Sequence, residues 1–205
     1  MNCFEKIFGK PSELQPKTEH VAIAIDTGDL AKRYAIAVIR PECLPQLKSR
    51  AAKIVLHKEK YLYVESATGV PWYVIACIHN QEMGSDLGVF KACLHNGERI
   101  IGTSKKTTLV PKGKGPFTTW ELAAIDALGG VGSHLKNKWT LSYSLDFLER
   151  FNGLGYRNRG IPSPYVWAMT DQYVKGHYVA DGKFDANAVS KNTGCVAMMK
   201  TLGIS

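Results

Sequence analysis

Glu82 is the residue whose type and setting best suit chemistry in this sequence. The spacing of Trp72, Ile75, His79 and Glu82 predicts that they share one face of a helix, and we expect this face to be buried. An apolar setting and the partial negative charge of a helix C-terminus both disfavour an ionised carboxylate. A protonated carboxylic acid is what a general acid in glycoside cleavage requires. The alternative interpretation is a capping or salt-bridged glutamate at a helix end.

Three further residues near Glu82 are candidates for supporting roles. His79 lies one turn earlier, where a core histidine competes with a residue that tunes Glu82 or contacts substrate. Glycosidases with two catalytic carboxylates hold them about 5 Å apart when retaining and about 6.5–9.5 Å apart when inverting. Asp86 and Glu98 are the candidates for a second carboxylate. Asp86 also suits a cap on the turn after Glu82, and Glu98 also suits a solvated position.

The elements that must position Glu82 are a helix and a predicted β-hairpin. Pro71 suits the first turn of the helix, which we expect to end at Gly84. Apolar runs at 90–94 and 99–101 then flank an Asn96-Gly97 pair, which is a strong hairpin signal because both residues tolerate positive φ. A loop rich in Gly, Lys and Pro follows. The carboxyl group is therefore expected to face a small β-hairpin.

The rest of the chain is predicted to be mainly helical. Two short apolar segments at 21–25 and 34–39 fit either strands or helices. Helical patterns cover residues 44–66, 119–129, 143–151, 164–174 and 186–202. We therefore expect a mostly α (α+β) fold. Its domain would span residues 41–205, with an N-terminal extension of uncertain structure at 1–40.

Two segments in the second half have the composition of a sugar-binding surface. Phe151-Asn152-Gly153-Leu154-Gly155-Tyr156 combines rings, which stack on sugars, with an amide, which bonds hydroxyl or N-acetyl groups. A helix-terminating turn explains the same segment equally well. Ser163 and Pro164 predict a capped helix start, after which Tyr165 is expected near a cleft and Trp167 in the core.

Charge and cysteine content restrict the classes of protein and partner. The 205 residues include 26 Lys and Arg against 18 Asp and Glu, a net charge of +8 that favours anionic partners. The densest basic cluster comprises Lys105, Lys106, Lys112 and Lys114. It fits a solvated loop better than a nucleic-acid site, so we expect no nucleic-acid partner. The five cysteines form no CxxC pair and no metal-type spacing, so we expect reduced thiols and neither metal nor cofactor.

The segments follow one another in an order that resembles a known family. The series consists of Trp72-x6-His79-x2-Glu82, Leu94-His95-Asn96-Gly97, Trp120-Glu121-x-Ala123-Ala124-x-Asp126, Glu149-Arg150-Phe151-Asn152-Gly153-x-Gly155-Tyr156, Ser163-Pro164-Tyr165-x-Trp167 and Tyr178-x2-Asp181-Gly182. It is similar to lysozyme-like proteins among phage endolysins and bacterial cell-wall hydrolases. The resemblance covers about residues 45–203, and its specificity lies in the ordered set rather than in any one motif.

The resemblance implies a lysozyme-like fold, in which a catalytic Glu ends a helix and faces a β-hairpin. Carried over, Glu82 becomes the general acid, and Asn152, Tyr156 and Tyr165 become cleft residues; His79 and Asn96 are further candidates for substrate contact. Goose-type lysozymes and lytic transglycosylases, which the 151–155 segment also resembles, work with one essential Glu. The product is thus either hydrolysed or a 1,6-anhydro sugar.

We therefore expect cleavage of the β-1,4 bond between N-acetylmuramic acid and N-acetylglucosamine in peptidoglycan. A chitinase-type hydrolase and a non-catalytic wall-binding module on the same fold are the alternatives. A third hypothesis is a basic nucleic-acid-binding protein, which the dispersed positive charge disfavours. With neither a secretory signal nor a membrane-spanning segment in the sequence, we expect the protein in the host cytoplasm, without stable membrane insertion, until a holin releases it to the periplasm.

Overall fold

The computed structural model describes residues 27–83, 87–132, 139–180 and 182–205, and is mainly helical. The helices are α2 (Thr27–Ile36), η1 (Pro41–Cys43), α3 (Leu44–Leu56), α4 (Lys58–Thr68), α5 (Trp72–Met83), α6 (Trp120–Gly132), α7 (Leu141–Asn152), η3 (Arg157–Arg159), α8 (Pro164–Trp167) and α9 (Cys195–Thr201). The strands are β1 (His177–Ala180) and β2 (Lys183–Asp185). The mostly α class predicted from the sequence is confirmed.

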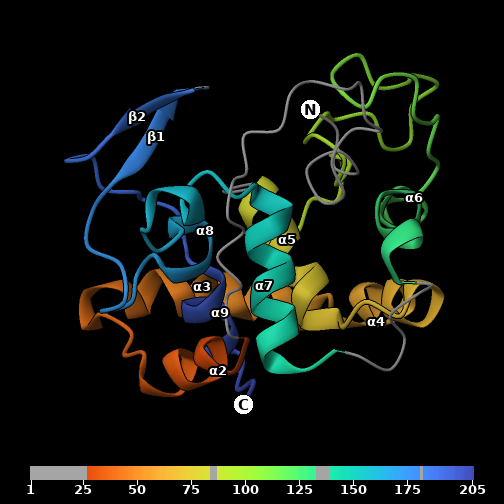
Figure 1. Cartoon of the computed structure of the whole chain (residues 1–205). Coiled ribbons are helices and arrows are strands. Elements are labelled where there is room, and N and C mark those ends of the chain that lie inside the picture. Colours follow the sequence, from red (N-terminus) through yellow and green to blue (C-terminus); the bar gives the residue numbers. More distant parts are fainter. Residues whose placement is uncertain (1–26, 84–86, 133–138, 181) are drawn as a thin grey trace.

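Helix α5 passes through the centre of the structure. Each residue from Val74 to Asn80 is buried, so this helix is enclosed on all sides. It packs against α4, α7 and α9 (Figure 1). The carbonyl of Pro71 accepts the first bonds of the helix, from the N–H groups of Val74 and Ile75, as expected for a proline at a helix start. The predicted helix from Pro71 to Gly84 is confirmed over the residues that the structure describes.

The predicted β-hairpin at 90–101 does not form strands. The backbone N–H of Cys93 bonds the carbonyl of Glu98 at 3.0 Å, and that of Ile101 bonds Lys91 at 3.1 Å, so the chain doubles back. No strand is assigned between residues 87 and 118. Phe90 and Gly102 have positive φ angles of 52° and 76°, which interrupt extended backbone on both sides of the turn. The turn was predicted correctly, and the strands around it were not.

The β-hairpin of this protein lies near the C-terminus instead. Strands β1 and β2 pair antiparallel, with Tyr178 opposite Phe184. Figure 1 shows this hairpin beside α8, on the other side of α5 from the loops that precede α6. The predicted hairpin facing Glu82 and the observed sheet are therefore different parts of the molecule.

Three predicted helices are shorter or divided. The pattern over 44–66 corresponds to α3 and α4, separated at His57, whose φ of −116° lies outside the helical region. The helix expected over 164–174 ends at Trp167, because Ala168 turns to an extended conformation and Met169 has a φ of 63°. That expected over 186–202 begins only at Cys195. The Ser163 side chain makes no cap bond.

The described part of the predicted N-terminal extension packs with the rest of the chain. Helix α2 lies against α7, and Leu30, Tyr34 and Ala37 are part of the hydrophobic core. The Tyr34 hydroxyl also donates to the carbonyl oxygen of Ile204 at 2.5 Å. Residues 27–40 thus share one core with the predicted domain. Within the described segments, none of the helices has the length and apolar character that crossing a bilayer requires.

Candidate functional site

His79 lies in the fully buried part of α5. Its ring packs against Phe90 and Trp120, with centroids 4.8 and 4.7 Å away, and its Nδ1 shares a 2.8 Å hydrogen bond with the Tyr61 hydroxyl. Burial, with a smaller contribution from His57, lowers the pKa of His79 from 6.5 to about 3. A neutral core histidine results, and its side chain does not reach the surface.

Glu82 lies one turn later and is exposed. The expectation that its carboxyl group would be buried is wrong. Because α5 is enclosed on all sides as far as Asn80, the spacing of apolar residues along it does not distinguish a core face from an exposed one. The helix leaves the core at its last turn, where Met83 remains buried and Glu82 is exposed.

Two amides fix the last turns of α5 to the C-terminal part of the chain. Gln81 Nε2 donates to the carbonyl of Tyr165 at 2.8 Å and to that of Thr193 at 2.5 Å. Asn80 Nδ2 donates to the Thr193 hydroxyl at 2.5 Å, and Asn80 Oδ1 accepts from Arg50 at 3.0 Å. The α8 segment therefore adjoins the helix end that carries Glu82. The sequence analysis predicted no role for Asn80 or Gln81, although this pair directly precedes Glu82.

The Asn96-Gly97 turn adjoins the same helix end from another direction. A β-carbon added to Gly97 would lie 3.9 Å from the backbone oxygen of Glu82. Gly97 has a φ of 77°, which disfavours any larger residue there. The turn therefore lies close to the backbone at the end of α5, whereas the β-hairpin that the resemblance implied opposite Glu82 is not formed.

Glu98 is held by the loop that follows it. Its carboxylate accepts from the backbone N–H groups of Thr108 and Leu109, the Thr108 hydroxyl and Asn96 Nδ2, at 2.8–3.0 Å. These bonds, first that from the Thr108 N–H, lower the pKa of Glu98 below its ordinary value. Glu98 therefore anchors the 107–109 loop as an ionised group, and Asn96 supports the same loop.

A second polar cluster joins this turn to α6. His95 Nε2 lies 2.7 Å from Asp126 Oδ2, and Lys114 Nζ lies 3.0 Å from the same oxygen. Burial lowers the pKa of His95, against the opposing effect of Asp126, so at neutral pH we assign a hydrogen bond between neutral imidazole and carboxylate rather than an ion pair. The ring stacks on Phe117 at 5.5 Å. This cluster was not predicted from the sequence, although His95 and Asp126 both belong to the motifs that resemble lysozyme-like proteins.

The remaining candidates are distributed as follows. Tyr156 is buried, and its hydroxyl bonds His177 Nδ1 and the N–H of Tyr178, each at 3.2 Å, which stabilises β1. Tyr165 is 7% exposed, contrary to the exposed position expected, and Trp167 is in the core as predicted.

Asn152 is partly exposed at the end of α7, and α5 and α7 end on the same side of the molecule (Figure 1). Asp86 lies outside the described residues.

No metal centre is found in the described ranges, where no group of three or more His, Cys, Asp or Glu side chains gathers as a metal ion would require. The described cysteines, Cys43, Cys77, Cys93 and Cys195, are unpaired thiols, as the sequence predicted. The end of α5 carries an exposed carboxyl group, that of Glu82, and two other segments adjoin this helix end through Gln81 and through the backbone oxygen of Glu82.

Comparison with known proteins adds no relative to this description. No protein-family model, curated protein or solved structure matches the chain.

Proposed function

We propose that this protein cleaves the β-1,4 bond between N-acetylmuramic acid and N-acetylglucosamine in peptidoglycan, with Glu82 as the general acid. The observation that carries the proposal is the meeting of three segments at one helix end. Glu82 is exposed there, and Gly97 lies near the backbone oxygen of Glu82. The Gln81 side chain donates a hydrogen bond to the backbone carbonyl of Tyr165. The same three segments carry the family-like motifs, although they are far apart in sequence.

The chemistry follows from the position of this carboxyl group. A general acid must reach the glycosidic oxygen of a polymer, so its carboxyl group must be accessible from the surface, as that of Glu82 is. This exposure removes the burial that was expected to keep the acid protonated. The partial negative charge at the C-terminal end of α5 disfavours ionisation of a nearby carboxyl group, and a bound glycan would exclude water from it. In this proposal Glu82 donates its proton to the leaving oxygen. Water, or the muramic 6-hydroxyl, then attacks the anomeric carbon and gives up its proton to the Glu82 carboxylate, which restores the acid.

A second carboxylate is not needed in this scheme. Glu98 accepts from three donor groups of the adjoining loop and from Asn96 in its own turn, which suits it to shaping the surface next to Glu82. The Asn96 amide is likewise bonded within this turn and loop, to Glu98 and Leu109, so it supports the loop beside Glu82 rather than contacting sugars directly. This assignment favours a mechanism with one essential Glu, as in the enzymes that the 151–155 segment resembles.

The exposure of Glu82 also supports a second candidate function. A non-catalytic wall-binding module needs no desolvated acid, and an exposed glutamate at a helix end is compatible with a binding or structural role. Such a module binds glycan unchanged and retains this binding when Glu82 becomes Gln. The two candidates therefore differ in the product and in the effect of a single substitution.

The test is the clearing of chloroform-permeabilised Gram-negative cells by the purified protein, with released muropeptides identified by mass spectrometry. Wild type should clear the cells, and Glu82→Gln should lose about 100-fold or more of the rate. Glu59→Gln is the matched control, because it removes the same charge from an exposed position on α4 and should leave the rate unchanged.

Each outcome separates the candidates. Reducing ends identify a hydrolase and 1,6-anhydro ends a transglycosylase. Release of chitin oligosaccharides without muropeptides would identify a chitinase-type enzyme instead. If wild type releases no product but sediments with purified wall, the enzyme proposal fails and the binding module replaces it.

A further inference from the structure

A cavity of about 690 Å³ lies away from Glu82, between α4, α6 and the segment that joins α5 to the Asn96-Gly97 turn. Its wall includes His57, Lys60, Phe90, Lys91 and Trp120, and Glu82 is not among the lining residues. This volume lies within the range of small-molecule sites in proteins, about 300–1,000 Å³. The cavity is therefore large enough for a ligand that is chemically unrelated to a glycan strand.

The wall of this cavity is built on rigid elements. Trp120 is 1% exposed and packs edge-on against Phe90 with ring centroids 5.1 Å apart. Thr119 begins α6, accepting the N–H of Leu122 on its hydroxyl at 3.3 Å. Phe90 keeps its φ of 52° while its ring is enclosed by aromatic neighbours. Residues in sparsely populated backbone regions persist when the surroundings determine them, so the aromatic contacts hold Phe90 in this conformation at the cavity wall.

The two lysines of the wall differ in their partners. Lys60 Nζ lies 2.5 Å from the carboxylate of Glu121, so this pair is neutral overall. Among the described residues, none places a carboxylate within ion-pair distance of Lys91. Lys91 lines the cavity, and its Nζ lies near Gly102, which directly follows the lining residue Ile101; a β-carbon added to Gly102 would lie 3.6 Å from this Nζ. The net charge of the two lysines and Glu121 is one positive unit.

Apolar side chains form the rest of the opening. Tyr63, Val89 and Leu122 line the same cavity and are 57%, 48% and 47% exposed. They come from α4, the connecting segment and α6, so tertiary folding brings them to one place. Exposed apolar groups around a concave surface mark binding sites more often than isolated exposed groups do.

We propose that this cavity binds a small carboxylic acid with an apolar body. The carboxylate would be held by Lys91, and the apolar part would lie against Tyr63, Val89 and Leu122. A monoanion is favoured over a phosphate dianion because only one positive charge of the lysines is left uncompensated. This binding does not depend on glycan cleavage by Glu82.

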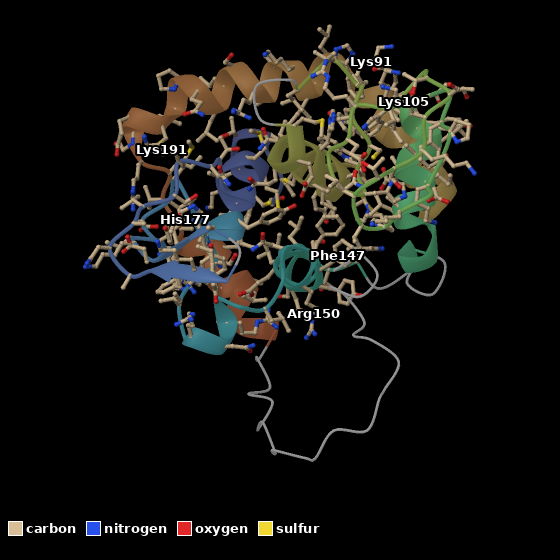
Figure 2. The ribbon with its side chains drawn as sticks, turned by 90° about the horizontal axis from the view of Figure 1, so that it is seen from above. Lys91, Lys105, Phe147, Arg150, His177 and Lys191 are labelled. Carbon is tan, nitrogen blue, oxygen red and sulfur yellow. The ribbon has the colours of Figure 1, made fainter. Side chains whose placement is uncertain are left out.

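The test uses 4-phenylbutyrate as the probe, titrated into the uniformly ¹⁵N-labelled full chain while backbone amide shifts are recorded. We expect saturable shifts confined to residues 57–63, 88–91, 101 and 118–122. Lys91→Met should weaken binding by about threefold to tenfold, the range of a partly exposed charged hydrogen bond. Lys105→Met is the matched control, because Figure 2 shows Lys105 on the same side of the molecule as Lys91. Lys105 is not among the residues that line the cavity.

A neutral analogue separates charge from apolar contact. 4-Phenylbutanamide should bind wild type about as weakly as 4-phenylbutyrate binds Lys91→Met, and Lys91→Met should not weaken the amide further. Leu122→Ser should weaken both probes. The spectra themselves report whether each variant is folded. The proposal is overturned if the shifts do not saturate, if they fall on another surface, or if Lys91→Met and Lys105→Met behave alike.

Discussion

His79 and Glu82 lie one turn apart on α5, yet His79 is fully buried and Glu82 is exposed. The first belongs to the enclosed part of the helix, where aromatic rings surround it. The second belongs to the last turn, where the helix reaches the surface and meets two other segments. The two regions teach that a helix can serve as core along most of its length and present a reactive group only at its end.

The largest expected effect is a loss of stability when a residue in the enclosed part of α5 is truncated. Ile78 has no exposed surface, so Ile78→Ala should lower the free energy of unfolding by about 2–5 kcal/mol through lost burial and a residual cavity. Urea unfolding followed by circular dichroism measures this loss. Val55→Ala, at an exposed position of α3, is the control and should change stability by less than about 0.5 kcal/mol. Equal effects at the two positions would contradict the central place of α5.

The second expected effect is a pH dependence of the free energy of unfolding, and it arises from His79. Its pKa is about 3 in the folded protein and 6.5 as an ordinary value, so the unfolded chain binds more protons between these limits. The stability contribution is present above pH 6.5 and is lost as the pH falls toward 3. From pH 6.5 to about 5 it should amount to about 2 kcal/mol.

The variant His79→Phe tests this dependence, because it keeps an aromatic ring and removes the titrating group. Its unfolding free energy should fall less steeply than that of wild type over the same pH interval, whatever its absolute stability. Other titrating groups, including His95, contribute equally to both proteins. Parallel pH profiles would show that His79 is not buried as a neutral group.

An effect of comparable size, and smaller than that of Ile78→Ala, is expected at the boundary between the two regions. Gln81→Leu removes the donor to the Tyr165 and Thr193 carbonyls, and should cost about 1–3 kcal/mol because those acceptors lose a partner. The amides of residues 163–167 should also exchange faster with solvent in hydrogen-exchange measurements. Unchanged exchange in this segment would mean that Gln81 does not hold it against α5.

The smallest effect on stability is expected at Glu82 itself. Because the side chain is exposed, Glu82→Gln should change the unfolding free energy by less than about 0.5 kcal/mol. Thermal unfolding of the two proteins measures the difference. A large loss of stability would mean that the carboxylate is structural. A stable variant without wall-clearing activity would locate the chemistry in the last turn of α5.

Helix positions in the middle of the chain could be predicted from the sequence because their signals are local. The helix after Pro71, the helices near 119–129 and 143–151, and the Asn96-Gly97 turn all follow from short-range patterns. The core position of Trp167 was predicted in the same way. The absence of strands at 90–101 could not be predicted, since it depends on the backbone of Phe90, which its aromatic neighbours stabilise.

Some features of the candidate site could likewise be predicted from the sequence, and others depend on the tertiary structure. The sequence by itself determined that a helix ends near Glu82, that a turn follows it, and which side chains could serve an acid. Only the tertiary structure decided that Glu82 is exposed, that Glu98 anchors a loop, that Tyr165 is buried, and that Lys91 lies at a separate cavity. The reason is physical: periodicity reports which residues avoid water on average, whereas exposure, ion pairing and cavities depend on contacts between segments distant in the chain.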